Sequence, residues 1–197
     1  MSEKTSGTPR EKAPSPYYPW ANYTNPEIKY NDYGTTSTIA KALNNPQLQS
    51  LMKQLNIQVA GPIQLGNGIM TFAFIDNGST ISGLDRKFTV YMEDGLGATI
   101  IARRLMAGAE GRMKLKEALK NPDVMAKIKE YKININDIQL VSLGFLERIG
   151  YRLWKGGAEA SDTHIDMSAT LTVEQMVKEL VKEIPKFAKL KSDHASK

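Results

Sequence analysis

The amino-acid sequence predicts an α+β protein made of two similar halves, and three observations lead to that prediction. The pentapeptide Ala42-Leu43-Asn44-Asn45-Pro46 recurs as Ala118-Leu119-Lys120-Asn121-Pro122. The tripeptide Ile63-Gln64-Leu65 recurs as Ile138-Gln139-Leu140. After each Asn-Pro pair, apolar residues first follow a helical period and then alternate as they do in strands. Each half is therefore expected to run helix, three strands, helix, with a mixed or antiparallel sheet and packed helices.

The sequence divides into three segments: an extended arm at residues 1–34, a first unit at 35–110 and a second unit at 111–197, the two units forming one compact body. The composition, with 41% apolar and 24% charged residues, is ordinary for a globular protein. No apolar run reaches the roughly 18 residues that span a membrane, and the N-terminus lacks the apolar region of a signal peptide. We therefore expect a cytoplasmic protein with no membrane partner.

In the first unit, Asn45 is expected to cap a helix that begins at Pro46, where the missing N–H costs nothing. The segment 69–75 is apolar on both sides of its alternation, which predicts a central strand. Asp76-Asn77-Gly78 predicts a turn. The expected order is a short helix at 35–43, the helix from 46, strands at 57–65, 69–75 and 87–93, and a closing helix at about 98–107. A short return strand at 79–82 stays open.

In the second unit, Asn121 and Pro122 predict another capped helix start. The residues Thr172-Val173-Glu174-Gln175 match a capping box. They open a long helix to about Lys191, in which Pro185 is expected to introduce a kink or end the regular part. The expected strands lie at 138–145, 147–154 and 163–171.

The arm is unusual because residues 17–33 hold six aromatic side chains spaced by prolines. Large rings need a surface to cover, and proline favours extended backbone. The arm is also neutral, with four basic and four acidic residues in positions 1–34. We expect it to dock on another protein subunit, while packing on the chain's own core and stacking on nucleic-acid bases stay open. The docking residues are Tyr17, Tyr18, Trp20, Tyr23, Tyr30 and Tyr33.

A basic stretch covers residues 100–132, where nine Lys and Arg stand against four Asp and Glu. A local basic excess favours an anionic partner, although a solvated helical face is the plainer interpretation. The residues expected to contact nucleic acid are Arg103, Arg104, Arg112, Lys114, Lys116 and Lys120.

Two further patterns suggest small-ligand chemistry. Gly95 and Gly97 lie between a predicted strand and a predicted helix, where N–H groups can hold a phosphate. The third glycine of a dinucleotide loop is missing, because Ile100 occupies its place. A second cluster, formed by Glu159, Asp162, His164 and Asp166, has ligands for a hard divalent ion, but it equally fits the polar face of a strand.

No zinc-protease, Walker or nucleophile-elbow motif occurs, and with no cysteine there are no disulfides or thiolate metal sites. The sequence favours a non-enzymatic subunit of a larger assembly, docked through its arm and associated with RNA or DNA, or a viral or structural subunit of the same kind. We expect no cofactor and no metal, and we expect the protein to form an oligomer. The alternative is an enzyme or binding protein for a phosphorylated ligand at the Gly95–Gly97 turn.

Overall fold

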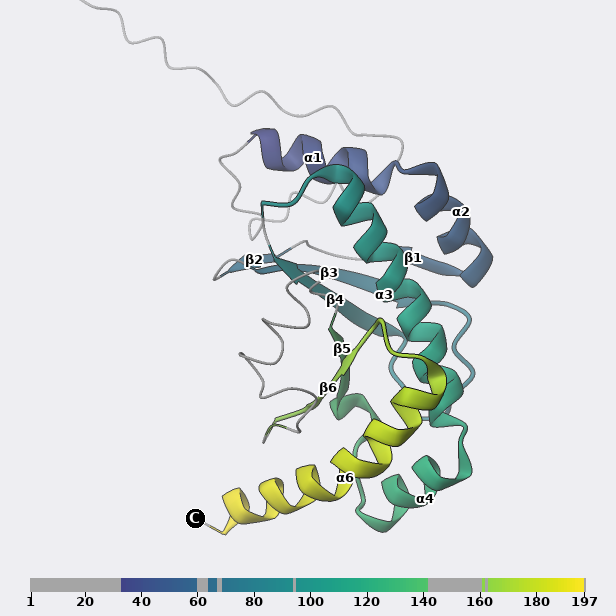
Figure 1. The fold of residues 1–197 in the computed structure, drawn as a ribbon, viewed down its shortest axis with the longest axis vertical. Coiled ribbons are helices and arrows are strands. Elements are labelled where there is room, and N and C mark those ends of the chain that lie inside the picture. Colours follow the sequence, from purple (N-terminus) through teal and green to yellow (C-terminus); the bar gives the residue numbers. More distant parts are fainter. Residues whose placement is uncertain are drawn as a thin grey trace, which may run out of the picture.

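A computed structural model describes residues 33–59, 64–66, 69–93, 95–141, 161 and 163–196. Within these ranges, helices lie beside a four-stranded antiparallel sheet and a two-stranded parallel sheet (Figure 1). The predicted α+β fold class is confirmed. None of the described helices is both long and apolar enough to cross a membrane.

The α-helices are α1 (Tyr33–Leu43), α2 (Pro46–Leu55), α3 (Ala98–Leu119), α4 (Pro122–Glu130) and α6 (Val173–Ala195), with a 3₁₀ turn η2 (Ile135–Asp137). The strands are β1 (Ile57–Val59), β2 (Gln64–Gly66), β3 (Ile69–Asp76), β4 (Lys87–Glu93), β5 (Ile138–Val141) and β6 (Ile165–Ser168).

The strand β3 is central in the larger sheet, as its two-sided apolar pattern predicts. It pairs with β4 along one edge, and β1 and β2 pair with opposite ends of its other edge. Phe72 and Ala73 point to opposite faces, and both are buried. In the smaller sheet, β5 and β6 are parallel.

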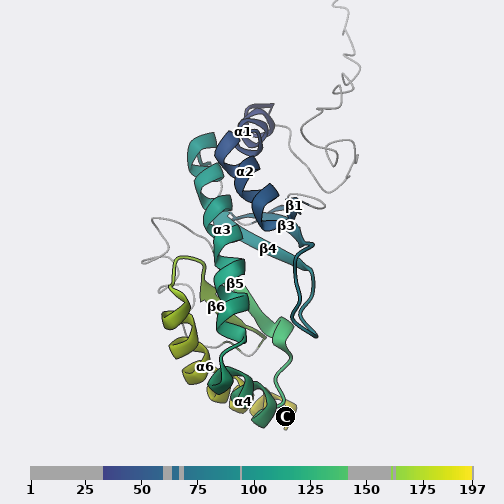
Figure 2. The same cartoon turned by 90° about the vertical axis from the view of Figure 1, so that its right-hand side faces the viewer.

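The long helix α3 connects the two halves of the molecule (Figure 2). α1 and α2 pack on its first part, and α6 packs on its last part beside α4. Two apolar cores result: Ile101 and Leu105 belong to the one under the larger sheet, whereas Leu115 and Leu119 belong to the one around β5, β6 and α6.

The expected helix end near residue 107 is wrong, because α3 continues to Leu119. The predicted boundary between units, at 110/111, therefore falls within one helix. Gly108 and Gly111 do not break α3. They let neighbours approach it: a Cβ on Gly108 would lie 2.6 Å from Val90 Cγ2, and one on Gly111 would lie 2.8 Å from the Cβ of Ala169.

Replacing Gly111 with alanine is expected to lower the free energy of unfolding, although alanine is the better helix former by about 1 kcal/mol. The added methyl group would meet backbone as well as side-chain atoms of Ala169, and overpacking costs about 1–3 kcal/mol. Urea denaturation measures the change. Glu110→Ala, on the exposed side of the same turn, is the control, and a more stable Gly111→Ala variant would contradict the close approach.

The internal repeat is present in two helical corners, each made of an Asn-Pro helix start, the helix that follows and a left-handed residue after it. Asn45 and Asn121 both cap the following helix, with ψ angles of 123° and 130°. Each is followed eleven positions later by a left-handed residue, Asn56 with φ 54° and Lys132 with φ 52°. Among the described strands the pairing differs between the halves, because β1 and β2 pair antiparallel with β3 whereas β5 pairs parallel with β6. In the described residues, the two halves thus share the helical corner.

Several predicted boundaries are corrected. Residues 57–65 form two strands rather than one, 79–82 form no strand, and only Ile165–Ser168 of 163–171 is a strand. α6 runs past Pro185 to Ala195, since Ile184 and Phe187 anchor both sides of the proline in the core. The predicted arm overlaps the start of α1. Its other residues and the predicted strand at 147–154 lie outside the described ranges.

Candidate functional site: a cavity where the two sheets meet

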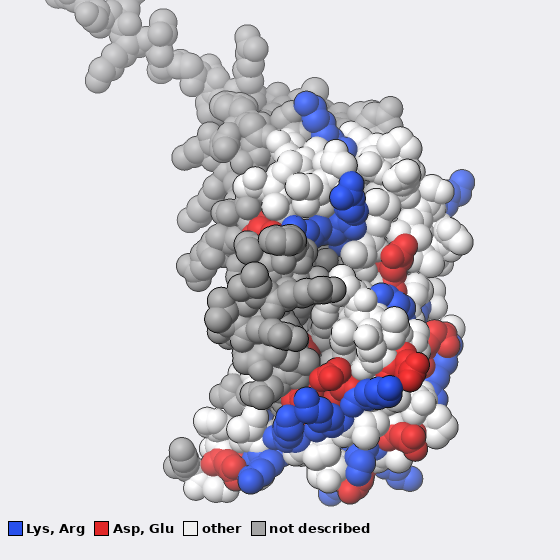
Figure 3. All heavy atoms as spheres, in the orientation of Figure 1, with Lys and Arg blue, Asp and Glu red and all other residues white. Residues whose placement is uncertain are grey.

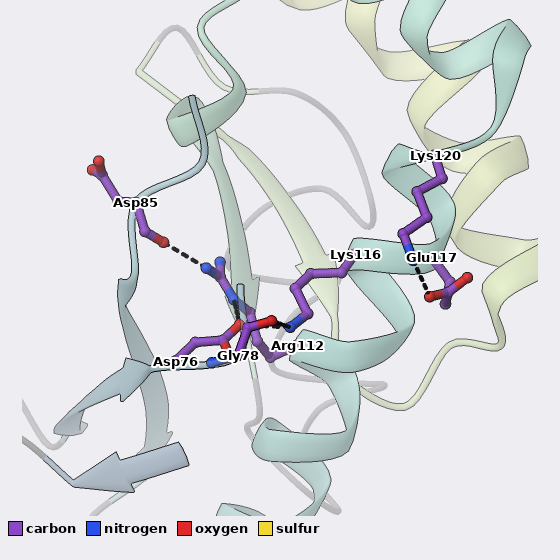
Figure 4. A network of polar contacts seen from close by, with 7 residues as sticks. All are labelled: Asp76, Gly78, Asp85, Arg112, Lys116, Glu117 and Lys120. Atoms are coloured by element: carbon purple, nitrogen blue, oxygen red, sulfur yellow. Dashed lines mark hydrogen bonds and ion pairs between the residues drawn. The ribbon is translucent and has the colours of Figure 1, made fainter. Parts of the chain in front are cut away.

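A buried ion-pair network fixes α3 to the end of β3 (Figure 4). The carboxylate of Asp76, which has no exposed surface, accepts from Arg112 Nε at 3.2 Å and pairs with Lys116 Nζ at 2.9 Å. Its other oxygen accepts the backbone N–H of Gly78 at 3.1 Å. Residues 112 and 116 lie one helical turn apart, so both cations reach the same carboxylate. The network sets the position of Arg112.

Arg112 is only 4% exposed. Its Nη2 donates to the backbone carbonyl of Asp85, and its guanidinium carbon lies 5.0 Å from the centre of the Phe88 ring. Burial lowers the pKa of Arg112, and the hydrogen bond to Asp76 and the charges of Asp76 and Asp85 oppose that shift. Guanidinium has five N–H donors, so the two bonds leave three for other acceptors.

Arg112 also lines a cavity of about 260 Å³ where β4 approaches β5. The described lining is mixed, with five apolar, three uncharged polar and three charged side chains. The lining residues are Leu84, Asp85, Lys87, Phe88, Thr89, Arg112, Leu115, Asn136, Ile138, Gln139 and Leu140. Among the described lining residues there is no histidine or cysteine, and the one carboxylate, on Asp85, belongs to an exposed residue. This set can bind an apolar group together with an anion, and it does not form a nucleophile–base pair.

The six predicted nucleic-acid residues all lie on or directly after α3, but most of them serve contacts within the chain. Arg104 pairs with Glu93, Arg112 and Lys116 pair with Asp76, and Lys120 pairs with Glu117. Lys114 donates to the carbonyl of Ala169 at 2.8 Å. Arg103 is exposed.

The surface charge agrees with this pairing. Figure 3 shows acidic and basic side chains interspersed over the lower part of this face, rather than one continuous basic area. Two ion pairs at the surface, Lys178 with Glu174 on α6 and Lys127 with Glu130 on α4, likewise place opposite charges side by side. Such pairs reduce the local potential that a phosphate backbone would meet.

The turn before α3 is open. Gly95 has φ 74°, which favours glycine, and no atom would lie within 4 Å of a Cβ on Gly95 or Gly97. Gly97 occupies the N-cap position of α3 without a side-chain hydrogen bond. The turn therefore has room for an anion beside the first N–H groups of α3.

His164 and Asp166 do come together, as their shared strand face predicts. His164 Nε2 lies 3.0 Å from Asp166 Oδ1, and His164 Nδ1 lies 2.7 Å from the hydroxyl of Thr163. Glu159 and Asp162, the other members of the predicted cluster, lie outside the described residues. Within the described part, no group of three or more His, Cys, Asp or Glu side chains can hold a metal ion.

Sequence reasoning missed Asp76 and Phe88 as neighbours of Arg112. The sequence placed Asp76 in a turn with Asn77 and Gly78, and a turn position gave no sign that its side chain is buried. Apolar residues alternate with other residues along 87–93. This alternation is the signal that could have placed Phe88 on the buried face of the strand. The contact with α3, however, depends on the packing of the sheet against the helix.

The six docking aromatics of the arm are not part of this site as described. Tyr33 begins α1, and its side chain is outside the described set, as are Tyr17, Tyr18, Trp20, Tyr23 and Tyr30. Family models, curated proteins and solved structures were compared with the chain, and none of them matches it.

Proposed function

We propose that this protein is a non-enzymatic subunit of a larger assembly, and that its N-terminal arm docks on a neighbouring subunit. The observation that carries the proposal is the cavity beside β4 and β5, whose lining combines apolar side chains such as Phe88 and Leu115 with a buried guanidinium. The arm has the complementary composition, with six aromatic residues and no net charge. Aromatic anchors in partly apolar pockets are the usual energetic centre of protein interfaces.

Association with RNA or DNA is the setting that the net charge of +5 favours. The ion pairs of Arg104, Arg112, Lys116 and Lys120 weaken it, because a phosphate backbone would have to compete with carboxylates already in place. We therefore place protein docking first and contact with nucleic acid second. Of the six predicted residues, Arg103 and Lys120 are exposed, and Lys120 is paired with Glu117.

Removing residues 1–32 is expected to convert the assembly to a smaller species and to leave the melting temperature of the individual subunit unchanged. The physical reason is that the arm would contribute its contact area across an interface rather than to the subunit's own core. Light scattering coupled to size-exclusion chromatography gives the mass, and circular dichroism gives the melting temperature.

An unchanged mass would overturn the docking proposal. If the shortened chain also melts at a higher temperature in inorganic phosphate, the result would support the runner-up, a phosphorylated ligand at the open Gly95–Gly97 turn. A large fall in melting temperature with the mass retained would place the arm in the subunit's own fold.

A further inference from the structure

Arg112 keeps hydrogen-bond donors that no described residue uses. Its Nε donates to Asp76 and its Nη2 donates to the backbone carbonyl of Asp85 (Figure 4). Among the described residues, none accepts from Nη1, which carries two N–H groups. Buried donors without acceptors cost free energy, and Arg112 is only 4% exposed. The position therefore favours an added acceptor.

The guanidinium of Arg112 lies at the wall of the cavity. Its Nη2 binds the carbonyl of Asp85, and its central carbon lies 5.0 Å from the centre of the Phe88 ring. Both of these residues line the cavity. Asp85 and Lys87, in the same lining, are exposed, so the cavity reaches solvent on that side. A ligand that enters from solvent would therefore meet the guanidinium.

The charges around Arg112 favour a ligand with one negative charge. The buried network holds one carboxylate, on Asp76, and two cations, on Arg112 and Lys116. In the described lining, the exposed Asp85 and Lys87 carry opposite charges, so Arg112 leaves an excess of one positive charge. Burial lowers the pKa of Arg112 despite its partners, because removal from water disfavours the cation. A bound anion would stabilise it.

The apolar part of the lining favours a ligand body of limited size. The apolar lining residues are Leu84, Phe88, Leu115, Ile138 and Leu140. The cavity measures about 260 Å³, whereas an engineered apolar cavity of about 150 Å³ in another protein binds benzene. The space is therefore sufficient for one ring of that size together with a carboxylate.

The wall beside Arg112 is held in place by hydrogen bonds within the chain. The side chain of Asn136 accepts from the N–H of Asp85 at 2.8 Å and donates to the carbonyl of Gly83 at 2.8 Å. Arg112 binds the carbonyl of Asp85 from the other side. Residues 83–85 are thus fixed without a ligand, and binding would need little further ordering of this segment.

We propose that this cavity binds a small organic monocarboxylate with an apolar body, and that the guanidinium of Arg112 binds the carboxylate. The planar guanidinium matches the two oxygens of a carboxylate. A phosphate monoester fits less well, because it carries about 1.5 to 2 negative charges at pH 7. The inference goes beyond the proposed docking function. Because both use the same cavity, the bound carboxylate is expected to compete with the arm.

Isothermal titration calorimetry of the full-length chain with benzoate, benzamide and acetate tests the class of ligand. Benzamide keeps the ring without the charge, and acetate keeps the carboxylate without the ring. Benzoate is expected to bind about tenfold or more tightly than benzamide, because its hydrogen bonds to Arg112 join two charged groups. It should also bind about tenfold or more tightly than acetate, because its ring is buried. Benzoate that binds no more tightly than benzamide would overturn the proposal.

A pair of matched variants tests the location. Leu84→Trp enlarges a lining residue and is expected to remove benzoate binding, because the indole ring would occupy the space. Leu96→Trp is the control: Leu96 is also half-buried and outside helices and strands, but it packs on the core under the larger sheet. Circular dichroism shows that both variants are folded. Unchanged benzoate binding in a folded Leu84→Trp protein would contradict this location.

A second pair of variants tests the charge on Arg112. The double variant Asp76→Ala/Arg112→Met removes the buried cation together with its carboxylate, and it should no longer prefer benzoate over benzamide. Arg86→Gln removes an exposed cation outside the described lining and should keep the preference. A preference that survives in the double variant would contradict the role of Arg112. If the double variant does not fold, the titrations of the natural chain and the tryptophan pair still decide.

Light scattering in saturating benzoate separates this inference from the docking function. A fall in the mass of the assembly supports competition between the carboxylate and the arm. Benzoate binding with an unchanged mass supports the ligand site and contradicts the placement of the arm in this cavity. If neither the full chain nor the chain without residues 1–32 binds benzoate, the ligand site is overturned. A smaller mass of that shortened chain would then leave the docking function standing.

Discussion

Replacing Asp76 with alanine is expected to lower the free energy of unfolding by about 3–5 kcal/mol, because it leaves the buried Arg112 without its carboxylate. Asp76 has no exposed surface and holds Arg112 Nε at 3.2 Å and Lys116 Nζ at 2.9 Å. Lys116 can turn its ammonium group towards solvent, whereas Arg112, at 4% exposure, is confined. Urea denaturation followed by circular dichroism measures the loss.

The matched control is Asp85→Ala. Asp85 is exposed and contacts Arg112 through its backbone carbonyl, which alanine keeps, so the change should stay within about 0.5 kcal/mol. Adding Arg112→Met to Asp76→Ala should recover part of the stability, since the unpaired charge is then gone. A loss below about 1 kcal/mol for Asp76→Ala would show that the network contributes little.

Phe72→Ala and Phe187→Ala are each expected to cost about 3–5 kcal/mol, the usual range for deleting a buried ring. Phe72 lies in the core under the larger sheet and Phe187 in the core around β5 and β6, and neither has exposed surface. Since α3 contributes side chains to both cores, each variant should still unfold in one cooperative transition. Calorimetry tests this point directly.

Two separate transitions, with Phe187→Ala shifting only one of them, would contradict the coupling through α3. That outcome would favour the division into units at 35–110 and 111–197. A similar result with Ile101→Ala and Leu119→Ala, which sit in different cores on the same helix, would confirm that α3 transmits no stability between them.

Local signals predicted the helix starts well. The side chains of Asn45, Asn121 and Thr172 each accept the backbone hydrogen bonds that a cap requires, because a cap depends only on residues two or three positions away. The central strand β3 was predictable for a similar reason, since its own alternation recorded burial on both sides.

The candidate site was only half predictable. The sequence marked Arg112 and Lys116 as basic residues of one stretch, and it marked residues 87–93 as a strand. It gave no partner for Arg112, because Asp76 is 36 positions away and reaches it only when β3 packs on α3. The sequence of the basic stretch therefore suggested an exposed cationic surface. In the structure, most of the residues predicted to contact nucleic acid make contacts within the chain instead.

The sequence by itself determined the α+β class, the capped helix starts and the repeated helical corner, since each follows from short-range periodicity and backbone hydrogen bonding. Tertiary structure alone decided that α3 continues through Gly108 and Gly111, that β5 pairs with β6 in parallel, and that residues of β4 and β5 line a cavity beside Arg112. Those features depend on which distant surfaces come into contact. By itself a glycine disfavours a helix. In the structure, Val90 and Ala169 occupy the space where side chains on Gly108 and Gly111 would lie.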